Sequence, residues 1–451
     1  MLNEKKNQIF KSIQFKCSKQ VLQELGDKYG PVMTFYFGAH RAVHLCNAEV
    51  IKEIIITRGK DFIGRPEPKM FQSESLKEGL VFATDSHWQK GRRWAMRAMR
   101  DFGMGKEQMV LKVNEEIGYM LDSMEALEGK TITTAEFLQS PISSVICMMI
   151  FSERFDEKNI PLKNGLDKID QVLKESQFIN FLHLCMPSLS YLLAPSISKN
   201  IQFSRHLIGG LMKKAIESHK KDFNPDDIRD FTDLYLQANG EIDYPHFEMM
   251  MVELFVAGQE TSLTTLKWLF MLISLHPEYQ RKCQKEIDSV IDTDRFPLTK
   301  DREHLPMVEA VINETARIAS IVPISAFHSN AQSHTLKGYE IPADTVVIYN
   351  TFALHHNEKY WGDPEVFRPE RWLDGDGKLV NHSDYFMPFG AGPRVCMGEQ
   401  LAKVELFHFT VALLQRFDFK LESKVDDIDS GECGFTNNPP SYTLSFSKRH
   451  N

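Results

Sequence analysis

The spacing of apolar residues predicts a mainly helical protein with small β-sheets. Over most of the chain, apolar side chains recur every three to four residues, the period of a helix packed on one side. Short β-rich runs, which we expect to form strands, occur at Val32–Phe37, Ala42–Cys46, Thr345–Tyr349 and Thr443–Ser447. No repeat, low-complexity tract or Gly/Ser linker divides the sequence, so we expect one large domain over residues 25–451.

The longest apolar stretch predicts a helix that crosses the whole core. It begins at Pro245, a favourable first-turn residue, and stops at Pro277, a length of about 45 Å at 1.5 Å per residue. Its middle nevertheless carries a polar cluster, Gly258-Gln259-Glu260-Thr261-Ser262. Because buried polar groups are costly without partners, we expect this cluster to have a function.

Composition and charge narrow the class of protein by exclusion. The 451 residues include 53 Lys+Arg against 61 Asp+Glu, and the net charge of −8 excludes a basic nucleic-acid-binding protein. Seven cysteines without a CxxC pair argue against a disulfide framework and indicate a reducing compartment. Residues 1–24 are lysine-rich and contain no apolar run long enough for a signal peptide or a spanning helix, so we expect a segment without a membrane anchor.

The strongest chemical signal is a glycine-rich loop around one cysteine. The sequence FGAGPRVCMG runs from Phe389 to Gly398 and leads directly into an amphipathic helical pattern. Glycines allow tight turns and close approach to a flat group, and free amides at a helix start favour a Cys396 thiolate, the form that binds metals. Arg394 would then face an anionic group. The alternative is a buried core cysteine, but five specified residues at fixed spacing favour a metal-binding loop.

FGAGPRVCMG resembles the haem-binding loop of the cytochrome P-450 family of haem-thiolate monooxygenases. Further motifs of that family follow in the expected order: WQKGR at 88–92, AGQETS at 257–262, ETAR at 314–317 and FRPERW at 367–372. Within that family, the sequence is most similar to the animal microsomal second family. The resemblance implies the P-450 fold, in which a long central helix lies over a haem held by the cysteine loop.

The resemblance implies b-type haem as the cofactor, with Cys396 as the axial ligand of its iron. Phe389 and Gly398 belong to the same loop, and Arg394 is similar to a family contact to a haem propionate. These four residues are therefore the expected haem-binding set of the loop.

Three more residues are expected at the haem propionates. Trp88 and Arg92 are four positions apart, so a helix places both on one face, and the family assigns them to a propionate. His328 lies where related sequences place another contact. For a lone histidine, an ordinary satisfied polar residue is an equally good interpretation.

Glu314 and Arg317 form an expected ion pair on an apolar helix. An i,i+3 pair is normally a solvated surface contact worth a few tenths of a kcal/mol. The sequence LPMVEAVINETARIA is too apolar for that interpretation, and a buried pair needs a further partner. The resemblance supplies Arg371 of FRPERW. We interpret the three as a structural cluster that supports the cysteine loop.

The polar cluster of the long helix holds two residues that the resemblance implies in proton delivery. Cleavage of dioxygen at a thiolate-ligated haem requires protons. Thr261 fits a hydroxyl donor, and Glu260 fits a carboxylate that connects this donor to solvent. The alternative for Thr261 is a hydrogen bond back to a helix carbonyl. The small residues Ala257 and Gly258 would let a bulky group lie against the helix.

A basic stripe indicates a docking face for an electron donor. Lys90, Arg93, Arg97 and Arg100 follow Trp88 at helical spacing. On an acidic protein such a face suits an acidic flavoprotein, although it is equally compatible with an ordinary solvated helix. The resemblance favours NADPH–cytochrome reductase, with cytochrome b5 as a second candidate.

Substrate contacts are inferred by position alone. The expected pocket residues are Phe82, Ala257, Val322 and Phe435, and most neighbouring side chains are apolar. We therefore expect a lipophilic small-molecule substrate.

The membrane relationship is expected to differ from that of the microsomal relatives. Those proteins carry an N-terminal spanning helix and a Pro-rich hinge, whereas this sequence shows neither. The apolar segment 178–197, interrupted by prolines, predicts a peripheral contact with the bilayer, its alternative being a buried connector. By resemblance we expect attachment to the cytoplasmic face of the endoplasmic reticulum, with a cytoplasmic location left open.

The motifs together predict a monooxygenase that inserts one atom of dioxygen into a xenobiotic, fatty acid or steroid. Electrons would come from NADPH through the reductase, because GxGxxG and Walker A motifs are absent. Two alternatives stay open: a haem-thiolate peroxide isomerase, against which Glu260 and Thr261 speak, and a haem-binding relative without catalysis.

Overall fold

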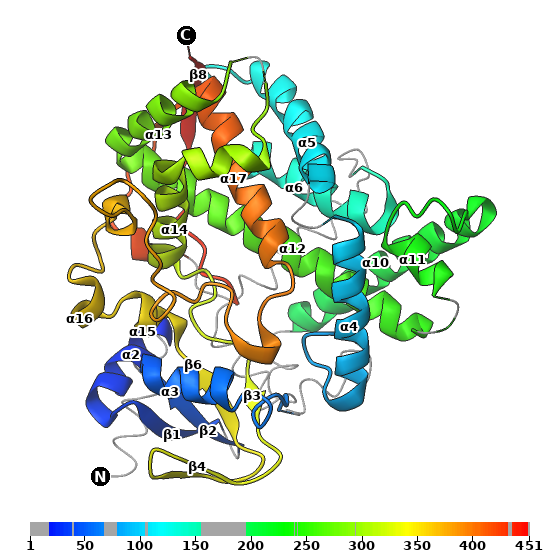
Figure 1. Ribbon diagram of the computed structural model, residues 1–451, viewed down its shortest axis with the longest axis vertical. Coiled ribbons are helices and arrows are strands. Elements are labelled where there is room, and N and C mark those ends of the chain that lie inside the picture. Colours follow the sequence, from blue (N-terminus) through cyan, green and yellow to red (C-terminus); the bar gives the residue numbers. More distant parts are fainter. Residues whose placement is uncertain are drawn as a thin grey trace.

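Helices dominate the structure, as the apolar spacing predicts (Figure 1). The computed structural model describes residues 18–37, 40–66, 79–103, 107–154, 195–238, 240, 242–293, 295–431 and 435–449. The α-helices are α2 (Ser18–Tyr29), α3 (Ala48–Lys52), α4 (Asp85–Asp101), α5 (Glu107–Glu125), α6 (Thr134–Phe151), α10 (Pro195–Asp222), α11 (Phe231–Gln237), α12 (Tyr244–Leu275), α13 (Pro277–Val290), α14 (Pro306–Ala319), α15 (Thr351–His355), α16 (Glu358–Trp361) and α17 (Glu399–Arg416). Shorter helical turns are η1 (Glu53–Thr57), η4 (Thr299–His304), η5 (Pro369–Trp372), η6 (Gly392–Arg394) and η7 (Ile428–Ser430).

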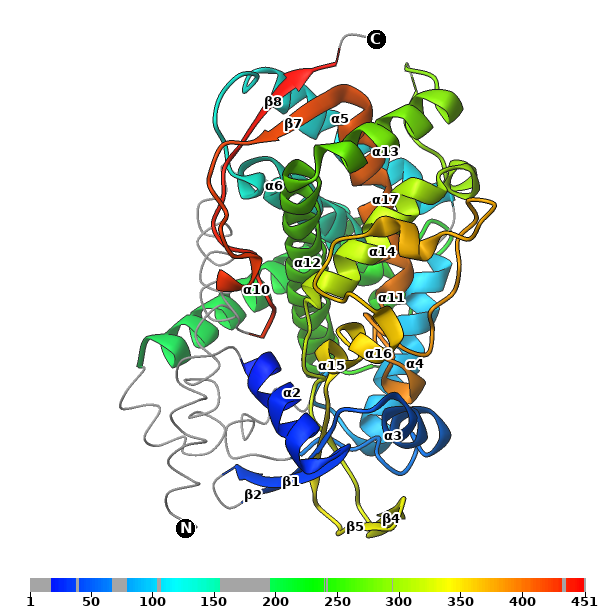
Figure 2. The same cartoon turned by 90° about the vertical axis from the view of Figure 1, so that its left-hand side faces the viewer.

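The strands form three small sheets at two ends of the helical body (Figure 2). They are β1 (Val32–Phe37), β2 (His40–Leu45), β3 (His328–Ser329), β4 (His334–Leu336), β5 (Tyr339–Ile341), β6 (Val346–Tyr349), β7 (Phe417–Leu421) and β8 (Leu444–Lys448). The largest sheet has the order β1-β2-β6-β3, and its β2–β6 pairing is parallel. All four predicted strand regions are present. The parallel pair joins segments about 300 residues apart, so this sheet closes only when both parts of the chain are folded.

The long helix α12 has the predicted position and almost the predicted start. Asp243 caps it by accepting a hydrogen bond from the His246 amide at 2.9 Å, and Pro245 occupies the first turn. The helix ends before Pro277, which begins α13. It runs through the middle of the molecule between α6, α14 and α17 (Figure 2).

Gly258 serves a different purpose from the one expected. A Cβ there would lie 2.8 Å from Ile146 Cδ1 on α6, so the missing side chain lets α6 and α12 pack closely. The sequence hypothesis of space for a bulky group at Gly258 is therefore wrong. Ala257 is exposed and remains compatible with that hypothesis.

Among the described residues, α6 is the one helix long and apolar enough to cross a membrane. Its apolar window is 72% buried inside the protein, and it packs on α5 and α12. These contacts are those of a core helix. The predicted membrane segment 178–197 lies outside the described residues up to position 194, and α10 begins at Pro195. The expected domain start, Leu25, falls inside α2.

Candidate active site

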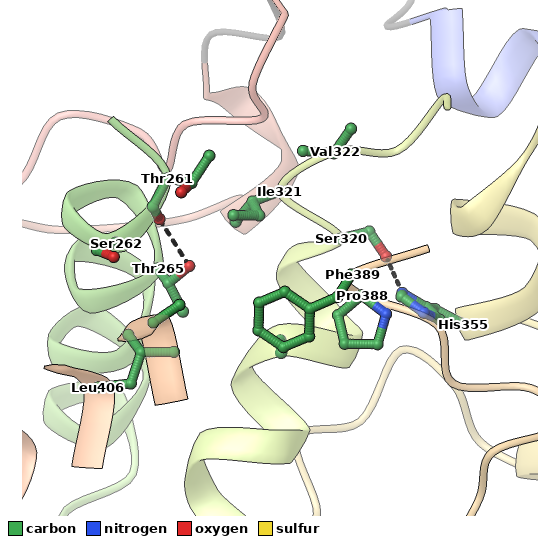
Figure 3. A pocket seen from close by; sticks show the side chains of 12 residues that line it. Thr261, Ser262, Thr265, Ser320, Ile321, Val322, His355, Pro388, Phe389 and Leu406 are labelled. Atoms are coloured by element: carbon green, nitrogen blue, oxygen red, sulfur yellow. Dashed lines mark hydrogen bonds between the residues drawn. The ribbon is translucent and has the colours of Figure 1, made fainter. Parts of the chain in front are cut away.

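An apolar pocket lies between α12, α14, α17 and the cysteine loop (Figure 3). It brings together three residues expected at the site: Thr261, Val322 and Phe389. The close-up shows the Thr261 and Thr265 side chains of α12 on one side and the Phe389 ring on the other. The apolar lining suits a flat lipophilic group or substrate.

The cysteine loop presents its thiol instead of burying it. Cys396 is exposed, whereas Cys147 and Cys283 are buried, so the core-cysteine alternative does not apply to Cys396. The Cys396 amide donates to the Phe389 carbonyl at 3.0 Å, which closes the loop. Gly390 and Gly392 have φ of 70° and 72°, a left-handed conformation that favours glycine.

Opposing effects act on the pKa of the Cys396 thiol. The amides of Gly398 and Glu399 lower it, as the sequence predicts for a helix start, and the Arg92 charge lowers it as well. Although Cys396 is exposed, protein atoms surround its sulfur closely, and the resulting loss of solvation is the larger effect, which raises the pKa above its usual range. The helix start therefore lowers the pKa of Cys396, as the sequence predicts, but does not by itself offset the loss of solvation. Binding of a metal is what would deprotonate this thiol.

Two guanidinium groups flank the indole of Trp88 beside the loop. Trp88 is buried, Arg394 Cζ lies 3.9 Å from its ring centroid and Arg92 Cζ lies 5.7 Å away. Arg92 donates to the Val395 carbonyl at 2.6 Å. Arg394 donates to the carbonyls of Ile63, Leu80 and Ala83 at 2.7–3.1 Å. Neutral carbonyls orient a guanidinium without cancelling its charge, so this pair of cations suits an anionic ligand.

Arg65 is a third cation at the same place and was not expected from the sequence. It donates to Val81 O at 2.8 Å and to Phe327 O at 2.7 Å, and burial lowers its pKa to about 10. Glu253 of α12 holds the same segment by accepting from the Val81 amide at 2.9 Å and from the Leu80 amide. Burial raises the pKa of Glu253 to about 7. The available signal for Arg65 was its place in the DFIGRP motif.

His328 is buried on β3 and is neutral. Its Nδ1–H donates to the Phe62 carbonyl at 2.9 Å. Burial, followed by the charge of Arg65, lowers the pKa of His328 to about 3. In this neutral tautomer the remaining nitrogen, Nε2, is an acceptor, so His328 offers an anion neither an ion pair nor a hydrogen bond.

The expected pair Glu260 and Thr261 makes separate contacts. Thr261 Oγ1 donates to the Ala257 carbonyl at 2.7 Å, which is the back-bonding alternative, while its side chain lines the pocket. Glu260 is 2% exposed and accepts from Thr264 Oγ1 at 3.2 Å and Thr436 Oγ1 at 2.9 Å. Glu260 therefore ties α12 to the C-terminal segment.

The structure brings Glu314, Arg317 and Arg371 together at the pocket's edge. Both nitrogens of the Arg317 fork, Nε and Nη2, contact the Glu314 carboxylate at 2.9 Å, and Arg371 Nε does so at 2.9 Å. The Arg368 amide at 3.0 Å and Trp372 Nε1 at 2.9 Å complete its shell. Since Glu314 and Arg317 are fully buried, this is a closed ionic cluster inside the protein.

The remaining predicted residues lie at or near the surface. Phe82 and Val322 are half-buried, and Phe435 is 50% exposed. The basic face, defined as Lys90, Arg93, Arg97 and Arg100, is exposed along α4.

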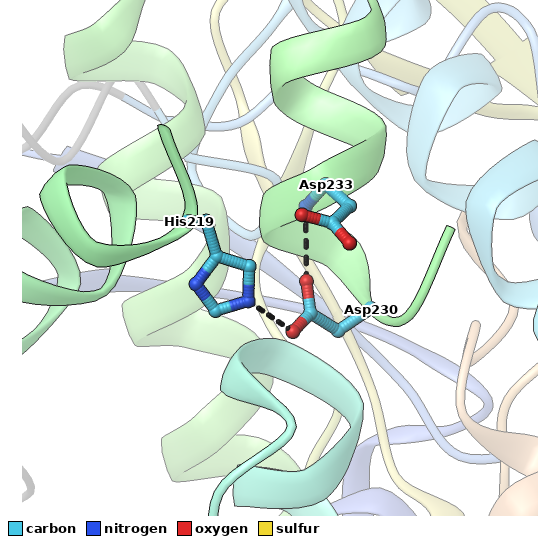
Figure 4. A group of neighbouring side chains, drawn as sticks. All are labelled: His219, Asp230 and Asp233. Carbon is cyan, nitrogen blue, oxygen red and sulfur yellow. Dashed lines mark hydrogen bonds and ion pairs between the residues drawn. The ribbon is translucent and has the colours of Figure 1, made fainter. Parts of the chain in front are cut away.

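A second group of potential metal ligands, His219, Asp230 and Asp233, is buried between α10 and α11 (Figure 4). Its ligand atoms lie within 4.8 Å of one another. His219 Nε2 contacts Asp230 at 2.6 Å and Nδ1 contacts the Ala215 carbonyl at 2.9 Å. Asp233 is paired with Arg229 at 2.7 Å. Because both imidazole nitrogens already face oxygen partners, we interpret the group as an ionic cluster that joins two helices.

Known proteins resemble this chain over almost its whole length. The family model described as Cytochrome P450 matches residues 8–446. Cytochrome P450 2C25 of Mesocricetus auratus is 34% identical over 452 aligned positions, which cover 97% of this chain and 91% of that protein. Cytochrome P450 2U1 of Bos taurus is 31% identical over 439 positions, covering 95% and 81%. Cytochrome P450 2B2 of Rattus norvegicus is 32% identical over 456 positions, covering 94% and 89%.

These relatives confirm the resemblance to the second P-450 family that the motifs indicated. The match includes the mainly helical architecture, the cysteine loop and the long helix α12 in one continuous alignment. The chain is therefore a member of the cytochrome P450 family.

Proposed function

We propose that Cys396 is the axial ligand of a b-type haem in this monooxygenase. The observation that carries the proposal is the exposed thiol of Cys396 on a loop that also borders the pocket beneath α12. The residues present fit the cofactor: a thiol for iron, an apolar pocket for a flat ring, and cations for its carboxylates. Membership of the family makes the protein an oxidoreductase that uses haem iron and dioxygen.

The propionates of the haem would be held by Trp88, Arg92 and Arg394, with Arg65 as an additional cation. This assignment is supported by the guanidiniums on the Trp88 ring, which are fixed by carbonyls and retain their charge. His328 lies beside these cations, and it would donate to a propionate only if its Nε2 were also protonated. Phe389 would pack against the ring, and Gly398 would keep its amide near the sulfur.

When bound, the haem supplies redox chemistry that activates dioxygen. The chain's own contribution is to hold a proton at Thr261 Oγ1, at the wall of the pocket. That hydroxyl donates its proton to the Ala257 carbonyl at 2.7 Å, so it would leave this bond to donate into the pocket, and its lone pairs can accept a replacement proton. Glu260, buried next to it in sequence, is proposed to take part in that resupply.

The proposed substrate is a lipophilic molecule of the xenobiotic, fatty acid or steroid class. Phe82, Ala257, Val322 and Phe435 are the proposed contacts, supported by the apolar lining near Val322 and by the exposed Ala257. The product would carry one oxygen atom from dioxygen. Residues 25–451 are proposed to form this single catalytic domain.

The proposed electron donor is an NADPH-dependent flavoprotein reductase, with cytochrome b5 as a second partner. The exposed basic face on α4 supports this, because its charge opposes that of an acidic flavoprotein. The second-family relatives support attachment to the endoplasmic reticulum, with segment 178–197 as the proposed peripheral contact.

The carbon monoxide difference spectrum of the reduced, haem-loaded protein tests the proposal. We expect a strongly red-shifted Soret band, because a thiolate ligand donates electron density to the iron. Cys396→Ala should abolish that band, while Cys283→Ala, which removes a buried cysteine, should retain it. A histidine-like spectrum in the parent protein would contradict the proposal.

A further inference from the structure

His355 is a buried histidine at the end of α15 that none of the recognised motifs includes. It is 1% exposed and lines the same pocket as Thr261 and Phe389 (Figure 3). Both of its ring nitrogens make defined contacts. It therefore has a fixed orientation at the edge of the proposed haem site.

The hydrogen bonds around His355 determine which nitrogen carries its proton. The Met387 amide donates to Nε2 at 3.1 Å, so Nε2 is the acceptor. Ser320 Oγ donates to the Arg317 carbonyl at 2.8 Å. The Nδ1–H of His355 then donates to Ser320 Oγ at 2.8 Å. The imidazole is thus a neutral tautomer with one donor and one acceptor in use.

His355 also contacts the ionic cluster. Arg317 Nη1 donates to the His355 carbonyl at 2.8 Å, while the rest of the Arg317 fork is bound to Glu314. The residue therefore touches the cluster through its backbone and Ser320 through its ring. It is held on two sides by groups that are themselves buried.

The Met387 peptide is the start of the cysteine loop. Its amide is bound by His355, and its carbonyl accepts from the Gly390 amide at 3.0 Å. Pro388, which follows, has no amide hydrogen to offer. The next residue, Phe389, uses its carbonyl to bind the Cys396 amide at 3.0 Å. A fixed Met387 thus fixes the turn on which the position of Cys396 depends.

We propose that His355 is a positioning residue for Cys396: by accepting the Met387 amide, it transmits the rigidity of the Glu314–Arg317 pair to the cysteine loop. This inference rests on the proposed function, in which Cys396 binds haem iron. Loss of the Met387 bond would let the loop move and weaken thiolate ligation without removing any group that touches the cofactor's iron.

The proposed role requires a neutral His355 imidazole, and its surroundings favour that form. Burial, followed by the charge of Arg317, lowers the pKa of His355 to about 3. Its acceptor nitrogen is therefore available throughout the range in which the protein would be assayed. The effect of a substitution should accordingly be the same at pH 6 and pH 8.

Two substitutions separate the two ring contacts. In His355→Asn the amide nitrogen replaces Nδ1 and keeps the donor to Ser320, but the acceptor for Met387 is lost. In His355→Gln the side-chain oxygen reaches the position of Nε2 and keeps the acceptor, but the donor to Ser320 is lost. Both variants are polar and smaller than or similar in size to histidine, so they control for each other.

The measurements are the carbon monoxide difference spectrum and hydrogen exchange of the peptide containing the Met387 amide, both on the haem-loaded full chain. We expect His355→Asn to lose the red-shifted band at least fivefold faster than the parent and to exchange that amide at least tenfold faster. His355→Gln should remain within twofold of the parent in both measurements.

Equal losses in the Asn and Gln variants, including equal unfolding, would overturn the inference, because side-chain volume would then explain them. Parent-like behaviour of His355→Asn would overturn it as well. Absence of the red-shifted band in the parent protein would instead refute the proposed function. The two failures are therefore distinguishable.

Discussion

Two buried glutamates near the pocket have opposite environments. Glu314 on α14 faces two guanidiniums, a backbone amide and the Trp372 indole. Glu405 on α17 has a single polar contact, from Ser262 Oγ of α12 at 2.5 Å. Its Oε1 is buried and has no hydrogen-bond partner among the residues that the structure describes.

The difference shows that compensation, more than burial, determines the charge of an internal carboxyl group. Cations and N–H donors surround Glu314 and compensate its carboxylate. Burial without a cation raises the pKa of Glu405 to about 8, so it is neutral at pH 7. The first glutamate is suited to a rigid support. The second, bound to the residue next to Thr261, holds a proton.

The largest effect is expected for Glu314→Gln, which removes the negative charge of the glutamate that has compensating partners. Arg317 loses its anion and Arg371 keeps only the more exposed Asp363, so the free energy of unfolding should fall by about 4 kcal/mol. Urea unfolding measures this. The control is Glu49→Gln, which removes an exposed pair with Lys337 and should cost less than about 1 kcal/mol. Similar losses in the two variants would contradict the closed-cluster interpretation.

At Glu405, the same change to glutamine should raise the free energy of unfolding instead of lowering it. The folded protein keeps this carboxyl protonated up to about pH 8, whereas the unfolded chain releases the proton near 4.5. Parent stability therefore falls as pH rises between these values, and Glu405→Gln removes that fall. Unfolding at pH 5 and pH 8 should show the variant gaining roughly 3 kcal/mol over the parent. A gain independent of pH would argue for a charged Glu405.

A smaller effect is expected for substitution of Thr261, which lines the pocket next to Ser262, the residue that contacts Glu405. Thr261→Ala removes the hydroxyl while leaving the cysteine loop intact, so the red-shifted band should persist. The yield of product per NADPH should drop on the order of a hundredfold, the lower end of the usual contribution of one proton donor. Thr261→Ser keeps the hydroxyl and should restore most of the yield. A serine variant as defective as the alanine variant would refute proton delivery by this group.

The smallest effect is expected for charge reversal on the basic face of α4, whose side chains are exposed to solvent. Arg93→Glu with Arg97→Glu reverses two charges of the exposed basic face. The KM for the reductase should rise several-fold at low salt, and the difference should shrink above about 0.3 M salt because exposed charges are screened. Lys420→Glu, also at an exposed position, is the control. A KM that ignores salt would exclude this face as the docking site.

Local sequence patterns predicted the elements and motifs whose signals lie within a few residues. The start of α12 near Pro245, the four strand regions and the meeting of Glu314 with Arg317 follow from periodicity and short spacing. Arg65, Glu253, Glu405 and His355 were missed because their roles depend on contacts with distant segments. The partners of Glu260 were missed for the same reason, since Thr436 lies 176 positions away.

The close contact of Gly392 with Ile55 determines when, during synthesis of the chain, the cysteine loop can reach its folded position. A side chain at Gly392 would collide with the Ile55 carbonyl. The cysteine loop therefore packs directly against the backbone of η1. The two residues are 337 positions apart. At 5–20 residues per second the ribosome needs roughly 17 to 70 s to make the intervening chain. The ribosome therefore makes η1 long before the loop, and the loop can take its place against η1 only when synthesis is almost finished.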